Sequence, residues 1–140
     1  MLGQYDNIVQ NFDYHIADER VNATATTTGD EVQLAGGPIL VMVYLDTVTT
    51  ADATHYFTFS VTQSTATGGT FAAADSSQYL VADSWDLIIN ATTEVGLKVF
   101  QFIPVAGYDF IKVVATETGT GDITYSAFVI QGGIHQPETT

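Results

Sequence analysis

Residues 100–130 read FQFIPVAGYDFIKVVATETGTGDITYSAFVI, and this stretch decides the fold. Apolar side chains recur at every second position in three successive segments, which is the period of a pleated β-strand. Pro104 and Gly107 separate the first segment from the second, and Gly119 and Gly121 separate the second from the third. Such residues are typical of tight turns. The stretch therefore predicts three consecutive strands that pair as a β-meander.

The chain upstream of this stretch contains further strand-like segments separated by turn-forming residues. Ile39–Leu45 is apolar at every position, as expected of a central strand with both faces covered. His55–Thr62 alternates between apolar and polar positions, which indicates one buried face. Shorter strands are expected at 21–28, 31–34, 79–81, 86–89 and 96–99. Because the body of the chain lacks a helical pattern, the residues predict an all-β protein built as an antiparallel β-sandwich.

Composition favours the same fold and restricts the partners. Threonine, which suits a half-buried pleated surface, occurs 21 times among the 140 residues, against 6 serines. This length is enough for one domain with one core. Sixteen acidic and three basic residues give a net charge of −13, which disfavours binding to phosphate backbones and anionic lipid. We therefore expect no nucleic-acid and no membrane partner, and the charge suits either solubility or a basic protein partner.

The two ends of the chain differ from its body. Apolar residues near the N-terminus are spaced as on one face of a helix: Leu2, Tyr5, Val9, Phe12 and Ile16. The same segment also fits an alternating strand around Tyr14, and its asparagines are weak helix formers. We predict an N-terminal arm over residues 1–20 that becomes ordered against a partner, with a frayed terminus or a first core strand as alternatives. The sandwich is expected over residues 21–131 and a C-terminal tail over residues 132–140.

The sequence predicts no catalytic residue, no cofactor and no metal site. His15, His55 and His135 form no HxH or HExxH pattern, so a zinc site lacks support. Carboxylates close in sequence are expected by chance among sixteen acids, and solvated loop acids explain them better than acid–base catalysis. Cysteine is absent, which excludes thiolate chemistry. We expect a protein that is not an enzyme.

Neither a secretion signal nor a membrane span is expected. Residues 1–6 lack the basic and apolar regions of a signal peptide. The longest apolar run, Pro38–Leu45, is far shorter than the ~20 residues that a membrane helix needs. We therefore expect a protein made and kept in a soluble compartment.

Two groups of segments carry a resemblance to a known family. In the first half, Ile16–Thr28 is rich in Ala and Thr, Val32–Leu34 is a brief strand, and Ile39–Leu45 is an apolar strand. In the second half, Phe102–Val105 and Tyr108–Val113 flank a Gly turn and precede a Thr/Gly turn and a final strand. In composition and order these segments, which cover most of the chain, resemble the tailed-bacteriophage capsid cement proteins of the Bordetella-phage type.

The resemblance implies a small β-sandwich of jelly-roll type that acts as a non-catalytic structural protein. Such a cement, or decoration, protein would be made in the host cytoplasm and would sit in the virion, on the outer surface of the capsid. There it would stabilise the shell by clamping neighbouring subunits of the major capsid protein, and a homodimer is implied. Candidate capsid contacts are the apolar residues of the two ends: Leu2, Tyr5, Val9, Phe12, Tyr14, Ile16, Ile134 and Pro137.

A second class of function stays open, a β-sandwich module that binds a ligand such as a carbohydrate. Carbohydrate binding of this kind needs a row of exposed aromatic side chains on one face of a sheet. The candidates for such a row are Tyr44, Tyr56, Tyr79, Trp85 and Tyr125. Tyrosines in a sandwich also serve the core or an interface, since the ring is apolar and the hydroxyl polar.

Overall fold

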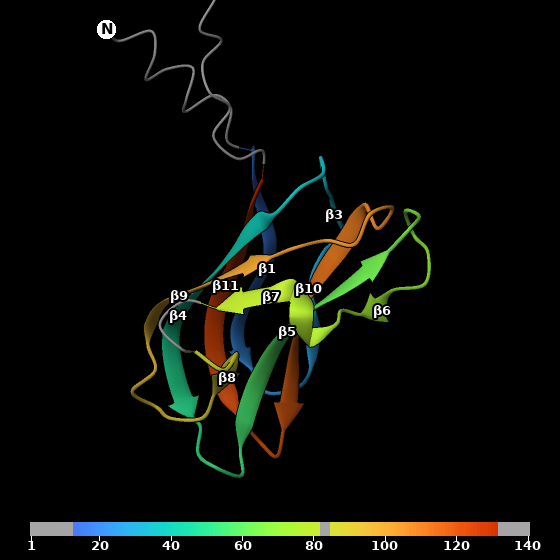
Figure 1. Cartoon of the computed structure of the whole chain (residues 1–140). Coiled ribbons are helices and arrows are strands. Elements are labelled where there is room, and N and C mark those ends of the chain that lie inside the picture. The colour runs from blue at the N-terminus through green and yellow to red at the C-terminus, as the bar shows by residue number, and fades with distance from the viewer. Residues whose placement is uncertain (1–12, 82–84, 132–140) are drawn as a thin grey trace, which may run out of the picture.

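The computed structural model describes residues 13–81 and 85–131. Eleven strands and one short 3₁₀ helix follow one another in these residues (Figure 1). Their bounds are β1 (Asp13–Ala23), β2 (Thr27–Thr28), β3 (Val32–Gln33), β4 (Ile39–Thr50), β5 (Tyr56–Ser64), β6 (Ala72–Ala73), η1 (Ser76–Gln78), β7 (Tyr79–Val81), β8 (Ile88–Ile89), β9 (Gly96–Phe102), β10 (Phe110–Thr118) and β11 (Asp122–Gln131). The predicted all-β class is confirmed.

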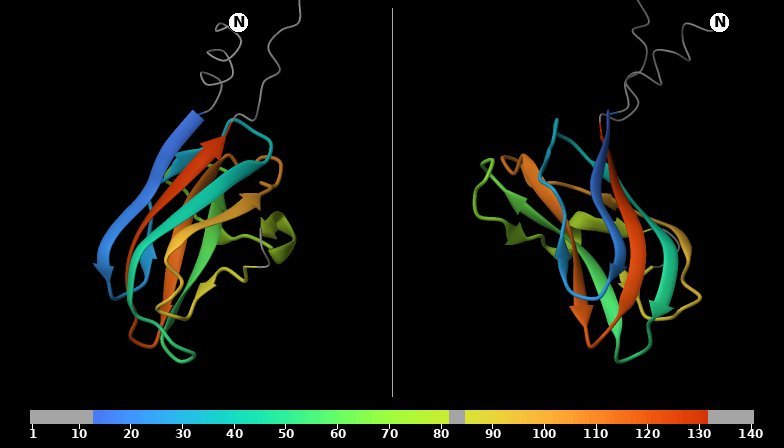
Figure 2. Two further views of the ribbon diagram at one scale, coloured as in Figure 1. Left: turned by 90° about the vertical axis from the view of Figure 1, so that its left-hand side faces the viewer. Right: turned by 180° about the vertical axis from the view of Figure 1, so that it is seen from behind.

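The strands form two antiparallel sheets that lie face to face (Figure 2). Sheet A has the order β1-β11-β4-β9-β7. Sheet B has the order β2-β10-β5-β6, with β3 also paired to β10 and β8 also paired to β5. This arrangement confirms the predicted antiparallel, sandwich-like architecture. The jelly-roll type stays a prediction. The chain changes sheet between β4 and β5 and again between β9, β10 and β11.

The predicted β-meander is wrong, although its three strands exist. β9 pairs with β4, β10 pairs with β5, and β11 pairs with β4 and β1. Each connection therefore carries the chain to the opposite sheet, and the turn after β10 passes tightly over the start of β5. A Cβ on Gly121 would lie 2.6 Å from the Phe57 ring, and Gly119 has a φ of +73°. Alternation within a strand indicates which side chains are buried, but it does not identify the strand that supplies the hydrogen bonds.

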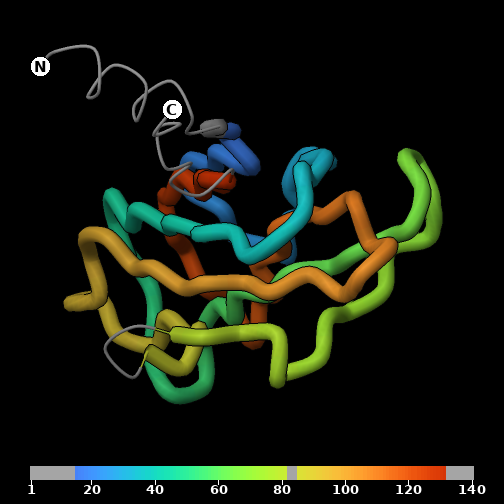
Figure 3. The backbone as a smooth tube through the Cα atoms, turned by 45° about the horizontal axis from the view of Figure 1, so that its top comes forward, coloured from blue at the N-terminus to red at the C-terminus, as the bar shows by residue number. Residues whose placement is uncertain are grey.

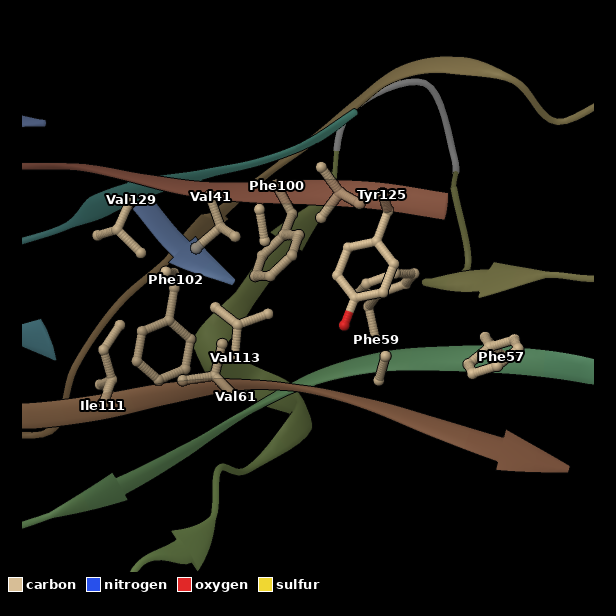
Figure 4. Packing of buried hydrophobic residues seen from close by; sticks show 14 of the residues in the cluster. Val41, Phe57, Phe59, Val61, Phe100, Phe102, Ile111, Val113, Tyr125 and Val129 are labelled. Atoms are coloured by element: carbon tan, nitrogen blue, oxygen red, sulfur yellow. The ribbon is translucent and has the colours of Figure 1, made fainter. Parts of the chain in front are cut away.

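The core fills the space between the two sheets (Figure 4). Phe57 and Phe59 of β5 and Phe100 and Phe102 of β9 are completely buried there. Burial of a side chain of this size contributes about 1.5–3 kcal/mol. Tyr125 of β11 stands edge-on to Phe59, with ring centroids 5.1 Å apart, which is a favoured aromatic geometry. These inward-facing aromatics hold the sheets together.

The N-terminal boundary of the sandwich lies earlier than predicted. The sequence pattern assigns residues 13–20 to the arm, whereas in the structure they belong to β1, which pairs with β11 from Asp13↔Gln131 to Ala23↔Ile123. Without β1, the long strand β11 would expose a row of unpaired backbone groups at the edge of sheet A. The first-strand alternative therefore holds for residues 13–20. Residues 1–12 lie outside the described residues.

Candidate functional site

The two ends of the described sandwich lie side by side. Asp13, at the start of β1, stands directly opposite Gln131, at the end of β11. Figure 3 shows the blue beginning and the red end of the coloured tube together. This neighbourhood follows from the antiparallel pairing, because one strand begins where the other ends. Residues 1–12 and residues 132–140 are therefore joined to the same corner of the sandwich.

Two of the predicted capsid contacts fall within the described strands. Ile16 lies on β1 opposite Phe128, and its side chain is 51% exposed. Tyr14 precedes it on β1, opposite Ile130. The structure thus brings these two positions to the same part of sheet A. The other predicted contacts lie outside the described residues and stay predictions: Leu2, Tyr5, Val9, Phe12, Ile134 and Pro137.

The outward surface of sheet A carries apolar side chains on all five strands. The left view of Figure 2 shows the long strands β1, β11, β4 and β9 side by side. We call this surface the outer apolar face and define it by Ile16 (β1), Ile130 (β11), Leu40, Met42 and Tyr44 (β4), Leu97 and Val99 (β9), and Leu80 (β7). On one side of β4, Met42 lies opposite Val99 and Tyr44 lies opposite Leu97; on the other side, Leu40 lies opposite Ile130. The register therefore joins the residues into adjacent rows.

The outward surface of sheet B has a different composition. Its positions on β5 and β10 are mostly polar (Thr58, Ser60, Thr62, Lys112, Thr116 and Thr118), and the exceptions are Tyr56, Phe110 and Val114. An antiparallel sheet with one solvated face is expected to carry polar residues on that face. Sheet B follows this expectation, whereas sheet A departs from it.

The sequence contains one signal of the outer apolar face. Ile39–Leu45 was apolar at every position, which predicted a central strand covered on both sides. The central position of β4 is confirmed, and its inward residues Val41 and Val43 are completely buried. Its outward residue Tyr44 is 47% exposed. The described residues therefore cover the inward face of β4 and leave its outward face partly open. The contributions of β7, β9 and β11 had no such signal, because each of these strands adds only one or two apolar residues.

A partly buried polar network closes the sandwich between β1 and β2. The Tyr125 hydroxyl donates to Asp18 Oδ2 at 2.6 Å and lies 2.5 Å from Thr27 Oγ1. Arg20 Nε donates to the other oxygen of Asp18 at 2.7 Å, and Arg20 Nη2 donates to the Thr28 carbonyl. Burial, together with the bond to Asp18, raises the pKa of the Tyr125 hydroxyl well above its usual range. Each of these side chains is hydrogen-bonded to another residue of the network, which links β1 and β11 of sheet A to β2 of sheet B.

A hollow of about 400 Å³ lies beside β5 and is bordered by Tyr79, Trp85 and Asp86. Trp85 Nε1 donates to the Ile88 carbonyl at 3.1 Å. The Tyr79 hydroxyl accepts from the Val61 amide at 2.8 Å. The hollow is therefore lined by aromatic rings whose polar atoms are already bonded within the protein.

The aromatic residues considered for a carbohydrate site do not form one row. Tyr44 lies on the outer apolar face, and Tyr125 is 1% exposed in the core. Tyr79 and Trp85 pack against the core beside the hollow, and Tyr56 begins β5. These residues therefore belong to several different places in the fold.

Among the described residues, His55 and Asp52 form a close contact between a histidine and a carboxylate. His55 Nδ1 lies 3.0 Å from Asp52 Oδ1, which also accepts from the Thr54 and His55 amides. These bonds, above all the one from the Thr54 amide, hold the pKa of Asp52 well below its usual range. The arrangement is a turn in which the carboxylate caps the backbone. No group of three or more metal-ligating side chains occurs in residues 13–81 and 85–131.

Within the described part of the chain, no helix has the length and apolar character needed to cross a membrane. A scan against protein-family models and a search of curated proteins both find no match for this sequence.

Proposed function

We propose that this protein is a non-catalytic decoration protein that cements a phage capsid by clamping neighbouring major capsid subunits from outside. The observation that carries the proposal is the pairing of Asp13 with Gln131, which joins both terminal segments to one corner of the sandwich. Both segments contain apolar residues, among them Leu2, Tyr5 and Ile134. Two apolar segments that leave one corner can reach two sites on the same surface. This geometry suits a clamp.

Attachment through two linked segments has a thermodynamic advantage. Once one segment binds, the other is held near its own site at a high effective concentration, and the overall affinity can exceed either single affinity by ~10²–10⁴. Each segment must lose conformational entropy on binding, at about 1–2 kcal/mol per ordered backbone residue. Apolar side chains can offset this loss by leaving water. The charge of −13 would speed capture by a basic shell surface, whereas the apolar contacts would hold the final complex.

A ligand-binding module is the second candidate function, supported by the hollow beside Trp85. Trp85 is the single tryptophan of the chain, so its fluorescence reports specifically on this hollow. A saturable change of Trp85 fluorescence with a member of a sugar library, lost when Asp86 at the border of the hollow is replaced by Ala, would favour this second function. A flat response across the library would favour the structural role.

Cosedimentation with capsid shells that lack the protein tests the proposal directly. The deletions should remove residues 1–12, residues 132–140, or both. These cuts leave β1 and β11 complete, because the strands begin at Asp13 and end at Gln131. We expect the full chain to sediment with shells, each single deletion to weaken binding at least about tenfold, and the double deletion to abolish it.

The melting temperature separates attachment from folding in this experiment. Because all three truncations leave β1 and β11 complete, the truncated proteins should melt close to the full chain. Normal shell binding by the double deletion would contradict the proposal, and so would the absence of this protein from purified virions by mass spectrometry.

A further inference from the structure

We infer that the hollow beside Trp85 binds an organic cation, that is, an ammonium or guanidinium group carried on an apolar stem. The inference rests on the second candidate function above, because it names the ligand class of the same hollow. It is independent of capsid attachment, which concerns the terminal segments. The volume of about 400 Å³ falls within the range of ~300–1,000 Å³ that small-molecule sites occupy.

The hollow lies where the edge of sheet B is interrupted along β5. β8 pairs with the beginning of β5, and β6 pairs with it near its end. Neither of these two strands pairs with residues 59–61. Instead, the Phe59 amide donates to the Leu87 carbonyl at 2.8 Å. The Val61 amide donates to the Tyr79 hydroxyl at 2.8 Å. The backbone amides that face the gap are therefore already bonded, and side chains are left to receive a ligand.

Leu87, at the border of the hollow, has a backbone conformation that is rare for its residue type. Its φ is +66°, in the left-handed region that favours glycine. The bond from the Phe59 amide fixes this residue, and next to it the Ile88 amide donates to Asp86 Oδ1 at 3.1 Å. Strained residues that are held in this way are frequent at ligand sites. The strained turn keeps the Asp86 carboxylate at the border of the hollow.

The chemistry of the lining favours a cation. Tyr79 and Trp85 are partly buried aromatic residues that border the hollow, and the faces of aromatic rings attract cations. The Tyr79 hydroxyl and the Trp85 indole N–H are already bonded to the backbone, so the rings are what these residues offer. Asp86 is exposed and adds a negative charge. None of the described residues that border the hollow is basic, and residues 21–97 contain neither Lys nor Arg.

An anion or a sugar would find fewer partners in the hollow. Asp86 and the net charge of −13 would repel an anion. A sugar presents several hydroxyls, each of which needs a partner once it leaves water. Besides Asp86, the described residues that border the hollow offer three side-chain hydroxyls, those of Thr58, Ser60 and Ser76. A cation on an apolar stem needs one acceptor and an apolar wall, and the hollow supplies both.

Titration of the full chain with small amines, followed by Trp85 fluorescence, tests the inference, because Trp85 is the only tryptophan. The cationic probes are n-butylamine and an Nα-acetyl-lysine amide. Their neutral counterparts are n-butanol and the same lysine amide acetylated on its side-chain nitrogen. At constant ionic strength we expect saturable binding of the cationic probes with dissociation constants of about 1–10 mM, since probes of this size make few contacts. The neutral counterparts should bind at least about tenfold more weakly.

The two cationic probes distinguish the two sources of such a group. Tighter binding of the lysine amide would assign the hollow to a side chain of a partner protein. Tighter binding of n-butylamine would assign it to a free amine. Either order supports the inference, because both probes carry the same ammonium group on a stem of the same length. In a separate salt series the binding of both should weaken as the ionic strength rises.

Asp86→Asn tests whether the probes bind in the hollow. The amide oxygen of Asn can still accept from the Ile88 amide, so the variant removes the charge and keeps the turn. The matched control is Glu19→Gln, which removes one negative charge from β1, at the opposite edge of sheet A from β7 and Tyr79. Because Asp86 is exposed, we expect a loss of affinity of about threefold or more in Asp86→Asn. The control should change the affinity by less than about 1.5-fold.

Three results would overturn the inference. One is equal affinity for a cationic probe and its neutral counterpart. Another is binding of the cationic probes that Asp86→Asn weakens no more than Glu19→Gln does. The third is the absence of binding of both cationic probes by fluorescence and by calorimetry. If a sugar then still gives a change that depends on Asp86, the second candidate function stands and the ligand class is wrong; if no sugar does, both fail.

Discussion

Replacing Tyr125 with Phe removes one hydroxyl from the network that joins β1, β2 and β11. The hydroxyl donates to Asp18 Oδ2 at 2.6 Å and lies 2.5 Å from Thr27 Oγ1. The ring would keep its edge-on contact with Phe59, because Phe differs from Tyr by a single oxygen atom. The substitution therefore removes hydrogen bonds and leaves the aromatic packing in place.

The expected loss follows from the burial of the acceptor. Asp18 is only 6% exposed, so water cannot easily replace the lost donor, and Arg20 Nε at 2.7 Å becomes its remaining strong side-chain donor. A hydrogen bond to a charged group contributes about 1.5–3 kcal/mol, and an unsatisfied buried acceptor adds to the loss. We expect the free energy of unfolding to fall by about 2–3 kcal/mol, which corresponds to roughly 6–12 °C in melting temperature for a domain of this size.

Urea unfolding followed by circular dichroism measures this change, with Tyr44→Phe as the control. Tyr44 is 47% exposed on the outer apolar face, so loss of its hydroxyl should change the free energy of unfolding by less than about 0.5 kcal/mol. If Tyr125→Phe also falls within about 0.5 kcal/mol of the natural sequence, the network does not tie the sheets together and the reasoning is refuted.

The same hydroxyl predicts a loss of stability at high pH. Burial, and then the bond to Asp18, raise the pKa of folded Tyr125, while an unfolded tyrosine titrates near its ordinary value of 10.0. The unfolded chain therefore releases this proton first as pH rises. The contribution of the Tyr125 hydroxyl to the free energy of unfolding is therefore fully present below pH ~10. It declines above pH ~10, as the pH approaches the raised pKa. Tyr125→Phe lacks this decline, so the difference in stability between the two proteins should narrow above pH ~10.

Three further substitutions, Glu31→Gln, Gly121→Ala and Gly107→Ala, test smaller features. The hydrogen bond from the Thr67 hydroxyl, and after it the one from the Gly68 amide, lower the pKa of Glu31, the residue before β3. These bonds to the loop after β5 should therefore persist above the ordinary pKa of 4.5 and be lost as the pH falls through the lowered pKa. In NMR spectra the loop amide should follow that titration, and Glu31→Gln should abolish it. Gly121→Ala would place a Cβ 2.6 Å from the Phe57 ring and should reduce the free energy of unfolding by about 1–3 kcal/mol. Gly107→Ala meets no neighbour within 4 Å and adds only the strain of a φ of +90°, about 1–2 kcal/mol, so urea unfolding should rank it as the milder change.

The sequence alone determined where most of the long strands lie and which of their side chains face inward. Phe57, Phe59, Phe100 and Phe102 are completely buried, as the two-residue period predicted for one face of each strand. Glycine and proline marked the ends of the segments for equally local reasons, since they depend on the conformation of a few residues. Local chemistry was therefore sufficient for the all-β class.

Strand pairing was decided only by the tertiary structure. β9, β10 and β11 follow one another along the chain, yet their hydrogen-bonding partners are β4, β5 and β1. Their alternation would be the same in a meander and in a sandwich, because either arrangement buries every second side chain. The same limit explains residues 13–20, whose weak pattern became a strand once β11 offered an edge to pair with.

The surface on sheet A also depended on the tertiary structure, apart from the apolar run Ile39–Leu45. The predicted contacts lay mainly in the terminal segments, and of these the described strands place only Tyr14 and Ile16. Leu80, Leu97 and Ile130 are far apart in the sequence, and each is unremarkable in its own strand. They become one apolar face because sheet A sets β7, β9, β4 and β11 next to one another. Alternation is a property of one strand, whereas a continuous surface requires the order and register of all of them.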